Sequence, residues 1–431
     1  MPLRTHYASE LRKGWSSSSP DSVKVAGWIH DVRTLGKIAF IILRDRSGFV
    51  QITLKPAEIG EHEFEEVCRV SRESVILVEG RPVPDPQAKI GAEVIAKKVT
   101  VLSEASTPLP LGVSDKVSAE METRFTHRVL DLRKPEVMRV FIFRDALIHE
   151  IRRFMRENGF IEVQTPKIVS SGAEGGATLF KVDYYGKIAY LAQSPQLYKQ
   201  GLMGAGLDRV FEISPAFRAE PSDTTRHLTE FTSFDAEVSF ISDMEDVLKI
   251  LESCIRHSIE KVNRELGLTL PVPDIPIPRV EYEQARSMLA ARGKDIPPYQ
   301  DIDTEGEKIL GEIMREKGYL WYFITRYPAA VKPFYIMEDG EYSRSFDLSY
   351  GGLEIASGGQ REHRIRELCA RMERMGLNLA DFEAYLEPFR YGMPPHGGWG
   401  LGIDRLVSSL LDLENVREGI LFPRDRYRLT P

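Results

Sequence analysis

The first hundred residues alternate between apolar and polar positions with the two-residue period of β-strands. Runs rich in β-branched residues are separated by turns that contain glycine, proline or aspartate. These runs cover residues 23–30, 38–44, 49–54, 74–80 and 93–102. A stretch with helical spacing, residues 61–70, lies between the third and fourth runs. Five strands with a helix before the fourth predict an OB-fold β-barrel over residues 1–103.

The period changes after residues 103–118, a stretch that contains proline, serine and glycine and predicts a linker. Residues 104–134 are therefore expected to form a hinge between two domains. From Pro135 to Asn158 the apolar positions recur at helical spacing with charged residues between them, and Gly159 follows. This pattern predicts a long amphipathic helix that ends at an Asn-Gly signal.

The remaining chain combines short strand-like runs with further helices. The strand-like runs cover residues 161–163, 189–191, 209–214, 231–240, 334–337, 344–350 and 352–355, and the helices cover 243–266, 362–375 and 403–411. A small mixed insertion is expected at about residues 265–340, and a glycine-rich turn before the last helix. Because strands and helices do not alternate as βα units, we expect an α+β domain at residues 135–431 with an antiparallel sheet flanked by helices.

Charge and composition indicate which partners and which cellular location to expect. The chain of 431 residues has a net charge of −7, yet residues 1–103 hold 15 basic and 13 acidic residues. A mildly basic barrel on an acidic body is compatible with a polyanionic partner. Cys68, Cys254 and Cys369 are scattered, which favours a reducing, intracellular location. No apolar run approaches the ~20 residues of a membrane helix, so a cytoplasmic protein without membrane association is expected.

Two arginine-bearing segments carry the strongest chemical signal. One contains Phe217-Arg218-Ala219-Glu220 and continues through residues 226–231, and the other is the glycine-rich segment 400–405, which ends in Arg405. A guanidinium is a planar fork that matches phosphate oxygens, so two of them can hold both ends of a triphosphate. No P-loop sequence is present. Such a segment on its own is also typical of a salt-bridged helix end; the two together favour a nucleotide site.

A third signal is acidic. Asp347 and Glu354 lie seven residues apart on neighbouring strand-like runs, and Ser357 follows three residues later. Hard oxygen ligands of this kind suit Mg²⁺, which takes its other ligands from phosphate and water. Two acids in this setting are also typical of solubilising charges on an edge strand, and the residues alone leave both interpretations open.

Taken together, these segments resemble the class II aminoacyl-tRNA synthetases, specifically the aspartyl-tRNA synthetases in their archaeal and eukaryotic form. The residues that resemble the three signature motifs are 159–166, 217–237 and 400–405, and the likeness extends to 193–200, 355–361 and 421–431. The resemblance implies an anticodon-binding barrel, an antiparallel catalytic sheet and a homodimer formed through the first motif. Its implied substrates are ATP, L-aspartate and tRNA, and its implied cofactor is Mg²⁺.

The resemblance also implies roles at the nucleotide. Arg218 would bind the α-phosphate and the substrate carboxylate, and with Arg405 it forms the implied catalytic pair. Glu220 would face the adenine amino group, and Phe231 would stack on the ring. The implied ATP-binding set is Arg218, Glu220, Arg226, His227, Leu228, Phe231, Glu354, Gly402, Asp404 and Arg405. The implied metal ligands are Glu354 and Ser357, with Asp347 beside them.

For the amino acid, Lys199 and Arg361 match positions that close on the aspartate side chain. Two cations facing a carboxylate select aspartate over asparagine, because the amide would leave both charges uncompensated. Asp235 matches the carboxylate that receives the α-amino group. The complete implied set is Glu174, Gln196, Lys199, Arg218, Asp235, Ser357 and Arg361.

In the barrel, Phe40, Gln51 and Glu79 match positions that meet anticodon bases. The third anticodon base distinguishes tRNA-Asp from tRNA-Asn. Two positions of the protein that the resemblance places near this base favour different specificities. His30 is similar to members that charge both tRNAs, whereas Lys89 is similar to strict members. A small ring with two hydrogen-bonding nitrogens leaves room for either pyrimidine. We therefore expect both tRNA-Asp and tRNA-Asn to be partners, with a strict tRNA-Asp enzyme as the alternative.

Three other functions are consistent with parts of the sequence. An asparaginyl-tRNA synthetase would lack the lysine at position 199. An asparagine-forming ligase that reuses this catalytic domain would lack the barrel at residues 1–103. A non-catalytic RNA-binding relative should have lost at least one of four residues, all of which are present: Arg218, Glu354, Arg361 and Arg405.

Overall fold

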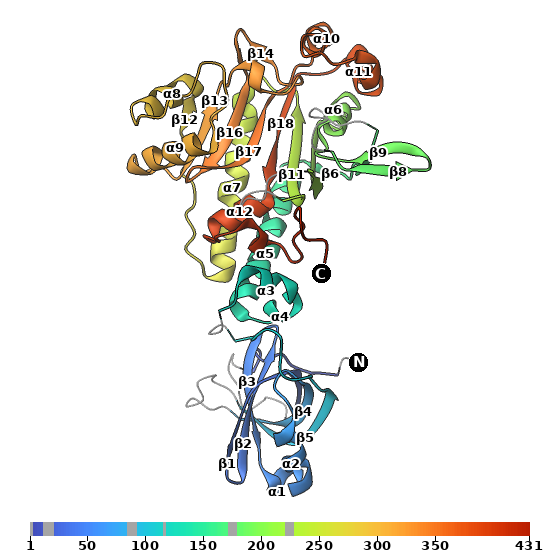
Figure 1. Ribbon diagram of the computed structural model, residues 1–431, viewed down its shortest axis with the longest axis vertical. Coiled ribbons are helices and arrows are strands. Elements are labelled where there is room, and N and C mark those ends of the chain that lie inside the picture. Colours follow the sequence, from blue (N-terminus) through green and yellow to red (C-terminus); the bar gives the residue numbers. More distant parts are fainter. Residues whose placement is uncertain (1–2, 12–20, 84–92, 115–117, 171–178, 220–227) are drawn as a thin grey trace. The chain divides into compact units, whose positions relative to one another are not determined.

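A computed structural model describes residues 3–11, 21–83, 93–114, 118–170, 179–219 and 228–431 (Figure 1). The chain divides into two compact units, Met1–Gly112 and Val113–Pro431. Within the described residues, no helix is long and apolar enough to cross a membrane.

The first unit is a closed five-stranded barrel with strand order β1-β2-β3-β5-β4. Its strands are β1 (Val23–Leu35), β2 (Ile38–Asp45), β3 (Gly48–Leu54), β4 (Val75–Val83) and β5 (Glu93–Ser103). Two short helices, α1 (Pro56–Ile59) and α2 (Glu61–Arg69), lie between β3 and β4. The predicted OB-fold barrel is confirmed, including the helix before the fourth strand.

The alternating apolar residues of the sequence point into this barrel, and many of the polar residues between them point outward. Val23, Val25 and Ile29 of β1 are buried and pack with the apolar residues of the other four strands. Gly27 lies where strands approach closely, since a Cβ there would meet the carbonyl oxygen of Arg44 at 2.2 Å. Several of the intervening residues of β1 to β3 are partly exposed on the outside of the barrel, among them His30, Phe40 and Gln51.

The second unit is built on an eight-stranded sheet with the order β12-β13-β16-β17-β18-β11-β10-β6. All pairs are antiparallel except β12 with β13 and β10 with β6. The strands are β6 (Ile161–Glu162), β10 (Arg209–Phe217), β11 (Glu230–Ser239), β12 (Arg279–Glu281), β13 (Trp321–Thr325), β16 (Ser345–Tyr350), β17 (Leu353–Gln360) and β18 (His396–Gly402). The prediction of a largely antiparallel sheet is therefore correct.

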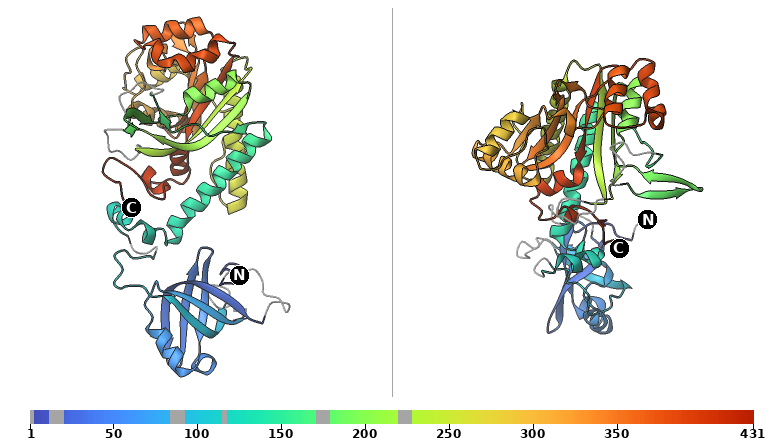
Figure 2. Two further views of the ribbon diagram at one scale, coloured as in Figure 1. Left: turned by 90° about the vertical axis from the view of Figure 1, so that its right-hand side faces the viewer. Right: turned by 45° about the horizontal axis from the view of Figure 1, so that its top comes forward.

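Two long helices, α5 (Pro135–Glu157) and α7 (Met244–Leu266), lie side by side against this sheet (Figure 1, Figure 2). Asp243 caps α7 by accepting a hydrogen bond from the Glu245 N–H, and Gly267 ends the helix in the left-handed region. The buried stripes of both helices and the inner face of the sheet share one apolar core, which includes Phe234 and Trp399. This core holds the central strands, and with them the candidate site, in a fixed position.

Smaller elements surround the sheet. They are α3 (Met121–Thr126), α4 (Arg128–Asp131), β7 (Ile168–Val169), β8 (Lys181–Tyr184), β9 (Lys187–Leu191), α6 (Gln196–Gly204), α8 (Tyr282–Ala290), α9 (Thr304–Glu316), β14 (Glu338–Asp339), β15 (Tyr342–Ser343), α10 (Ile365–Arg374), α11 (Glu383–Arg390) and α12 (Ile403–Leu410). Strands β7, β9 and β8 form a separate small sheet, and its β8–β9 hairpin projects from the body of the unit (Figure 1).

Two local predictions are wrong. Residues 334–337 form a turn with a single bridge from Ile336 to Arg361, although their apolar pattern predicted a strand. The glycine-rich segment before α12 is the central strand β18 and contains no turn. Its glycines allow close packing of neighbouring strands, because a Cβ on Gly398 would meet the Ala236 carbonyl oxygen at 2.0 Å.

Candidate active site

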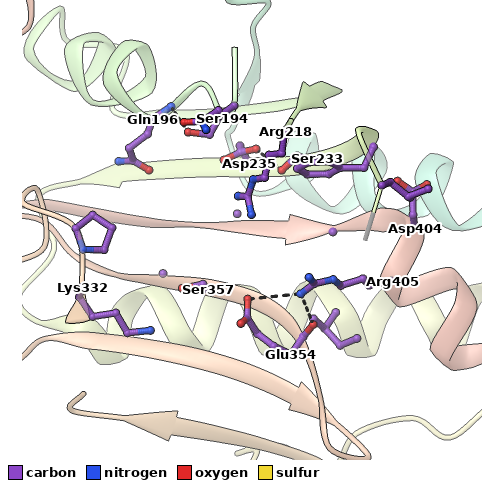
Figure 3. Close-up of a pocket in the computed structure, with 18 of the residues that line it drawn as sticks. Ser194, Gln196, Arg218, Ser233, Asp235, Lys332, Glu354, Ser357, Asp404 and Arg405 are labelled. Carbon is purple, nitrogen blue, oxygen red and sulfur yellow. Dashed lines mark hydrogen bonds and ion pairs between the residues drawn. The ribbon is translucent and has the colours of Figure 1, made fainter. Parts of the chain in front are cut away.

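The central strands frame a cavity of about 290 Å³ (Figure 3). Its lining gathers residues from α6, β11, β17, β18 and α12, together with Arg218 just after β10, and these are far apart in the sequence. The predicted site residues that line it are Gln196, Arg218, Leu228, Phe231, Asp235, Glu354, Ser357, Arg361, Gly402, Asp404 and Arg405. The fold therefore brings the separate sequence signals into one place.

Several predicted residues are not part of this lining. Glu174, Glu220, Arg226 and His227 lie outside the described residues, as does Lys89 of the barrel. Two described residues, Lys199 and Asp347, are buried next to the cavity but are not among the residues that line it.

At one end of the cavity, an aromatic ring and two guanidinium groups lie close together. The Arg218 guanidinium carbon is 5.3 Å from the centre of the Phe231 ring. Arg405 Nη1 donates to the main-chain carbonyl of Glu354 at 3.1 Å and lies 3.9 Å from its carboxylate. A flat ring beside two fixed cations suits a heteroaromatic base with a phosphate chain.

Asp404 lines the cavity and also forms contacts that the sequence did not indicate. Its carboxylate accepts hydrogen bonds from Arg144 of α5 and, at 2.6 Å, from the Thr232 N–H of β11. Burial raises the pKa of Asp404, and the Arg144 charge opposes that shift. The side chain thus fastens the start of α12 to β11 and α5, which fixes the adjacent Arg405.

The acidic residues lie on paired strands. In the β16–β17 pair, Asp347 is directly opposite Ser357, and Ser349 is opposite Glu354. The register shifts at a bulge between these two pairs. Burial, followed by the charge of Asp347, raises the pKa of Glu354. A buried carboxyl whose ionisation is disfavoured by a neighbouring carboxylate is a suitable place for a cation.

Lys332 is a cavity residue that the sequence analysis missed. Its Nζ lies 2.7 Å from Asp347 Oδ2 and 3.8 Å from the centre of the Tyr327 ring. Burial alone would lower the pKa of Lys332, but the charge and hydrogen bond of Asp347 and the nearby charges of Glu354 and Asp301 together raise that pKa. Nothing in the local sequence around Lys332 indicates this contact, since its partner is fifteen residues away on β16.

The residues present fit a magnesium ion. Asp347 Oδ1 is buried without a hydrogen-bond partner, and Glu354 and Ser357 supply two more oxygens on the neighbouring strand. The described residues contain no cluster of three or more His, Cys, Asp or Glu side chains that could hold a metal. A site with few protein oxygens is what Mg²⁺ prefers, because it keeps waters and phosphate oxygens as its other ligands.

The opposite end of the cavity has a balanced set of buried charges. Lys199 Nζ lies 3.1 Å from Asp235 Oδ1, 2.8 Å from the Trp399 carbonyl oxygen and 3.4 Å from Glu237 Oε2. Arg361 pairs with Glu237 and lines the cavity. Both predicted cations are therefore present, but each already contacts a carboxylate, and Lys199 lies behind Asp235.

A chain of hydrogen bonds leads from Arg361 into the interior. The Arg361 guanidinium donates to Gln196 Oε1 at 3.2 Å, and the Gln196 amide donates to Gln200 Oε1 at 2.9 Å. The Gln200 amide then reaches His396 Nε2 at 2.9 Å. His396 Nδ1 lies 2.8 Å from the Pro394 carbonyl, which can only accept, so Nδ1 carries the proton. Burial lowers the pKa of His396 to about 4.

Sequence reasoning missed Glu237, Gln200 and His396. A signal for Glu237 was available, because it lies two residues after Asp235 on a strand and therefore faces the same side. Gln200 likewise follows Gln196 by one helical turn. For His396 we find no local signal, since its role depends on contacts with α6.

The predicted anticodon residues lie on the outer surface of the barrel. Phe40 of β2, Gln51 of β3 and His30 of β1 are each partly exposed on three adjacent strands. Glu79 of β4 is also partly exposed and pairs with Lys24 at 3.1 Å. This outward face is the one that OB-folds use for oligonucleotides.

The fold and the cavity define a class II aminoacyl-tRNA synthetase with a nucleic-acid-binding barrel. The family model of class II tRNA synthetases (D, K and N) matches residues 120–426, and the OB-fold nucleic acid binding domain matches residues 23–102. The asparaginyl-tRNA synthetase of Pyrococcus horikoshii, solved with asparaginyl-adenylate, has a similar structure with a TM-score of 0.88. It is 33% identical and covers 95% of this chain and 96% of its own.

Similarity to curated proteins is higher. The aspartate–tRNA(Asp) ligase of Thermococcus kodakarensis is 49% identical, over 99% of this chain and 100% of its own length. The aspartate–tRNA(Asp/Asn) ligase of Methanopyrus kandleri is 48% identical, over 95% of this chain and 96% of its own. The chain belongs to the archaeal-type aspartyl-tRNA synthetase family.

Proposed function

We propose that this chain is an aspartate–tRNA ligase that charges both tRNA-Asp and tRNA-Asn. It activates L-aspartate with ATP and transfers the aspartyl group to the 3′ end of the tRNA. The observation that carries the proposal is one cavity with two functions: Arg218, Phe231 and Arg405 suit ATP, while Lys199 and Arg361 suit an acidic amino acid.

The chemistry is difficult because the aspartate α-carboxylate must approach the negatively charged α-phosphate. Arg218 neutralises both groups and holds them together, so that the carboxylate oxygen attacks the phosphorus as pyrophosphate leaves. Arg405 binds the outer phosphates at the cavity end that it shares with Glu354. Asp235 receives the α-amino group, and Gln196 helps to orient the substrate from α6.

Magnesium belongs to this proposal as the ion held by Glu354 and Ser357, with Asp347 buried beside them. When bound it would neutralise phosphate charge as a Lewis acid. Lys332 contributes from the protein side: it holds one oxygen of Asp347 and leaves the other available.

Selection of aspartate over asparagine rests on charge. Lys199 and Arg361 together carry +2, which the carboxylates of Asp235 and Glu237 balance. An incoming aspartate side chain adds an anion that Arg361 can bind from the cavity lining, with Lys199 behind. An asparagine amide gives no such gain, which argues against the asparaginyl alternative.

Recognition of both tRNAs is proposed from position 30. The most similar relatives include both tRNA(Asp) and tRNA(Asp/Asn) ligases, so family membership does not decide the question. His30 is partly exposed on the outward face of the barrel together with Phe40 and Gln51. The deciding experiment is aminoacylation with G-U-C and G-U-U anticodon transcripts; a thousandfold preference for G-U-C would contradict relaxed recognition.

A homodimer is the proposed assembly. The first signature segment forms β6 and the start of the chain toward β7, and it exposes apolar side chains. Ile161 is 48% exposed, and Ile142 of the neighbouring α5 is 44% exposed. Sedimentation of the wild type and of an Ile142→Glu/Ile161→Glu variant tests this assignment, since two charges on that surface should shift the protein to monomers.

A further inference from the structure

His30 occupies an irregular point of the barrel. In the β1–β2 pair, Ile29 faces Leu43 and Asp31 faces Ile42, so His30 is the extra residue of a β-bulge. A bulge redirects the side chain of the residue that it contains. The His30 ring packs against Phe49 of β3, with 5.0 Å between ring centres.

Behind His30 lies a buried ion pair. Arg44 Nη1 and Nη2 donate to the two carboxylate oxygens of Glu73, at 3.0 and 2.7 Å. The side chains are only 5% and 1% exposed. Glu73 adopts a left-handed backbone with φ of 68° and donates its N–H to the Ile29 carbonyl at 2.7 Å, beside the bulge. The Glu73 backbone hydrogen bond thus connects the ion pair to β1, the strand that contains His30.

Arg44 also reaches the imidazole, with Nη1 3.1 Å from His30 Nδ1. A guanidinium has donors and no acceptor, so His30 Nδ1 must be the acceptor in this contact and carries no proton. Burial, followed by the Arg44 charge, lowers the pKa of His30, which keeps the ring neutral near pH 7. The single ring proton must then be on Nε2, an atom that bonds to no residue in the described parts of the chain.

We propose that the Arg44–Glu73 pair fixes His30 as the Nε2–H tautomer. In this tautomer His30 can donate a hydrogen bond to the third anticodon base but cannot accept one from it. This inference rests on the proposed function, namely that the barrel binds anticodons of both tRNAs. Arg44 and Glu73 act here as positioning residues, because they reach the base only through the ring that they orient.

The consequence for the base follows from pyrimidine chemistry. Cytosine and uracil share a carbonyl at C2 and differ at N3 and C4: cytosine has an N3 acceptor and a C4 amino donor, and uracil has an N3–H donor and a C4 carbonyl acceptor. A ring that only donates can bond to the shared carbonyl of either base, and it cannot accept from the cytosine amine. When Nε2–H donates to this shared C2 carbonyl, position 30 gives no preference for cytosine, and the G-U-U anticodon is accepted.

The tautomer can be read directly in the free, full-length protein. Long-range proton–nitrogen NMR with ¹⁵N-labelled histidine distinguishes the two nitrogens, and comparison with His30→Gln assigns the signal. At pH 7.5 we expect an unprotonated Nδ1 and a protonated Nε2. A protonated Nδ1, or a ring protonated on both nitrogens, would overturn the proposal. This measurement involves no tRNA, so its failure is distinguishable from a failure of relaxed recognition.

A double variant tests the positioning role. Arg44→Met/Glu73→Met removes both charges together and leaves neither buried alone. We expect a mixture of His30 tautomers and a rise of about fivefold in the kcat/KM ratio of G-U-C to G-U-U transcripts, because the second tautomer can accept from the cytosine amine. Aspartate-dependent pyrophosphate exchange should stay unchanged.

The matched control is Arg69→Met/Glu65→Met, which removes an exposed Arg–Glu pair of the same barrel and should change neither tautomer nor ratio. A folded Arg44→Met/Glu73→Met protein with wild-type tautomer and ratio would overturn the positioning role. If that variant does not fold, the wild-type spectrum still decides the assignment. A wild type with the Nε2–H tautomer that charges only G-U-C would overturn the recognition consequence.

Discussion

Arg361, which lines the cavity, and Glu237 form a buried ion pair. Arg361 Nε donates to Glu237 Oε1 at 2.9 Å, and Nη2 lies 3.3 Å from Oε2. Burial alone would raise the pKa of Glu237, but the charges of Arg361 and Lys199 outweigh it and lower that pKa. Glu237 therefore stays ionised between the two cations and fixes the guanidinium that lines the cavity.

The first prediction concerns Lys199, whose ammonium group is also close to the Glu237 carboxylate. Lys199→Leu removes a buried cation and leaves Asp235 and an incoming aspartate poorly compensated. We expect a loss on the order of 2–5 kcal/mol in kcat/KM for aspartate, with the KM for ATP little changed. Pyrophosphate exchange with aspartate and asparagine measures this effect.

The control for Lys199 is Lys134→Leu, another buried lysine that pairs with a carboxylate, Asp131 at 3.6 Å, whereas the carboxylates beside Lys199 are those of Asp235 and Glu237. It should affect stability without changing aspartate dependence. An unchanged aspartate dependence in Lys199→Leu would remove this residue from substrate selection and reopen the asparaginyl alternative.

A second prediction tests the metal site. Glu354→Gln keeps the shape of the side chain but removes its negative charge beside Asp347. Adenylate formation should fall steeply and recover partly at high Mg²⁺, whereas binding of tRNA to the barrel should persist. Titration with Mn²⁺, followed by its paramagnetic signal, should show weaker binding than to the wild type. Glu367→Gln, an exposed acid of α10, is the control; equal Mn²⁺ binding in both variants would contradict the assignment.

A third prediction concerns acid stability. His396 is buried, and its pKa of about 4 lies below the ordinary value of 6.5, so the unfolded chain binds a proton that the folded chain does not. Stability that is present above pH 6.5 is therefore lost as the pH falls toward 4, on the order of 3 kcal/mol from this group. Glu237 opposes this shift, whereas Arg361 and His363 add to it.

Urea unfolding at pH 7 and pH 4.5 measures the effect. His396→Gln should lose less stability between these two pH values than the wild type, because glutamine does not titrate. His149→Gln, at an exposed position of α5, should behave as the wild type. A His396→Gln protein with the full acid sensitivity of the wild type would assign the loss to other groups.

The sequence was informative where local pattern and chemistry coincide. Alternation predicted the barrel because each of its strands buries one face, and the two arginine segments, far apart in the sequence, both contribute residues to one cavity. It failed at β18, where glycines read as a turn although Gly398 is needed for close strand packing. It also missed Lys332 and His396, because each is defined by a partner on another element and leaves no periodic signal nearby.

The last prediction concerns the size of the side chain at position 30. His30→Trp replaces a ring that leaves room for either pyrimidine with an indole, whose single N–H donor and larger area restrict the space at the third base. The Arg44 guanidinium would also lose its acceptor, since indole accepts no hydrogen bond. We expect the preference to shift toward tRNA-Asp, mainly through slower charging of the G-U-U transcript. Parallel kcat/KM measurements on both transcripts test this, with His62→Trp on the exposed face of α2 as the control. Equal loss on both transcripts would mean that position 30 supports the barrel without selecting the base.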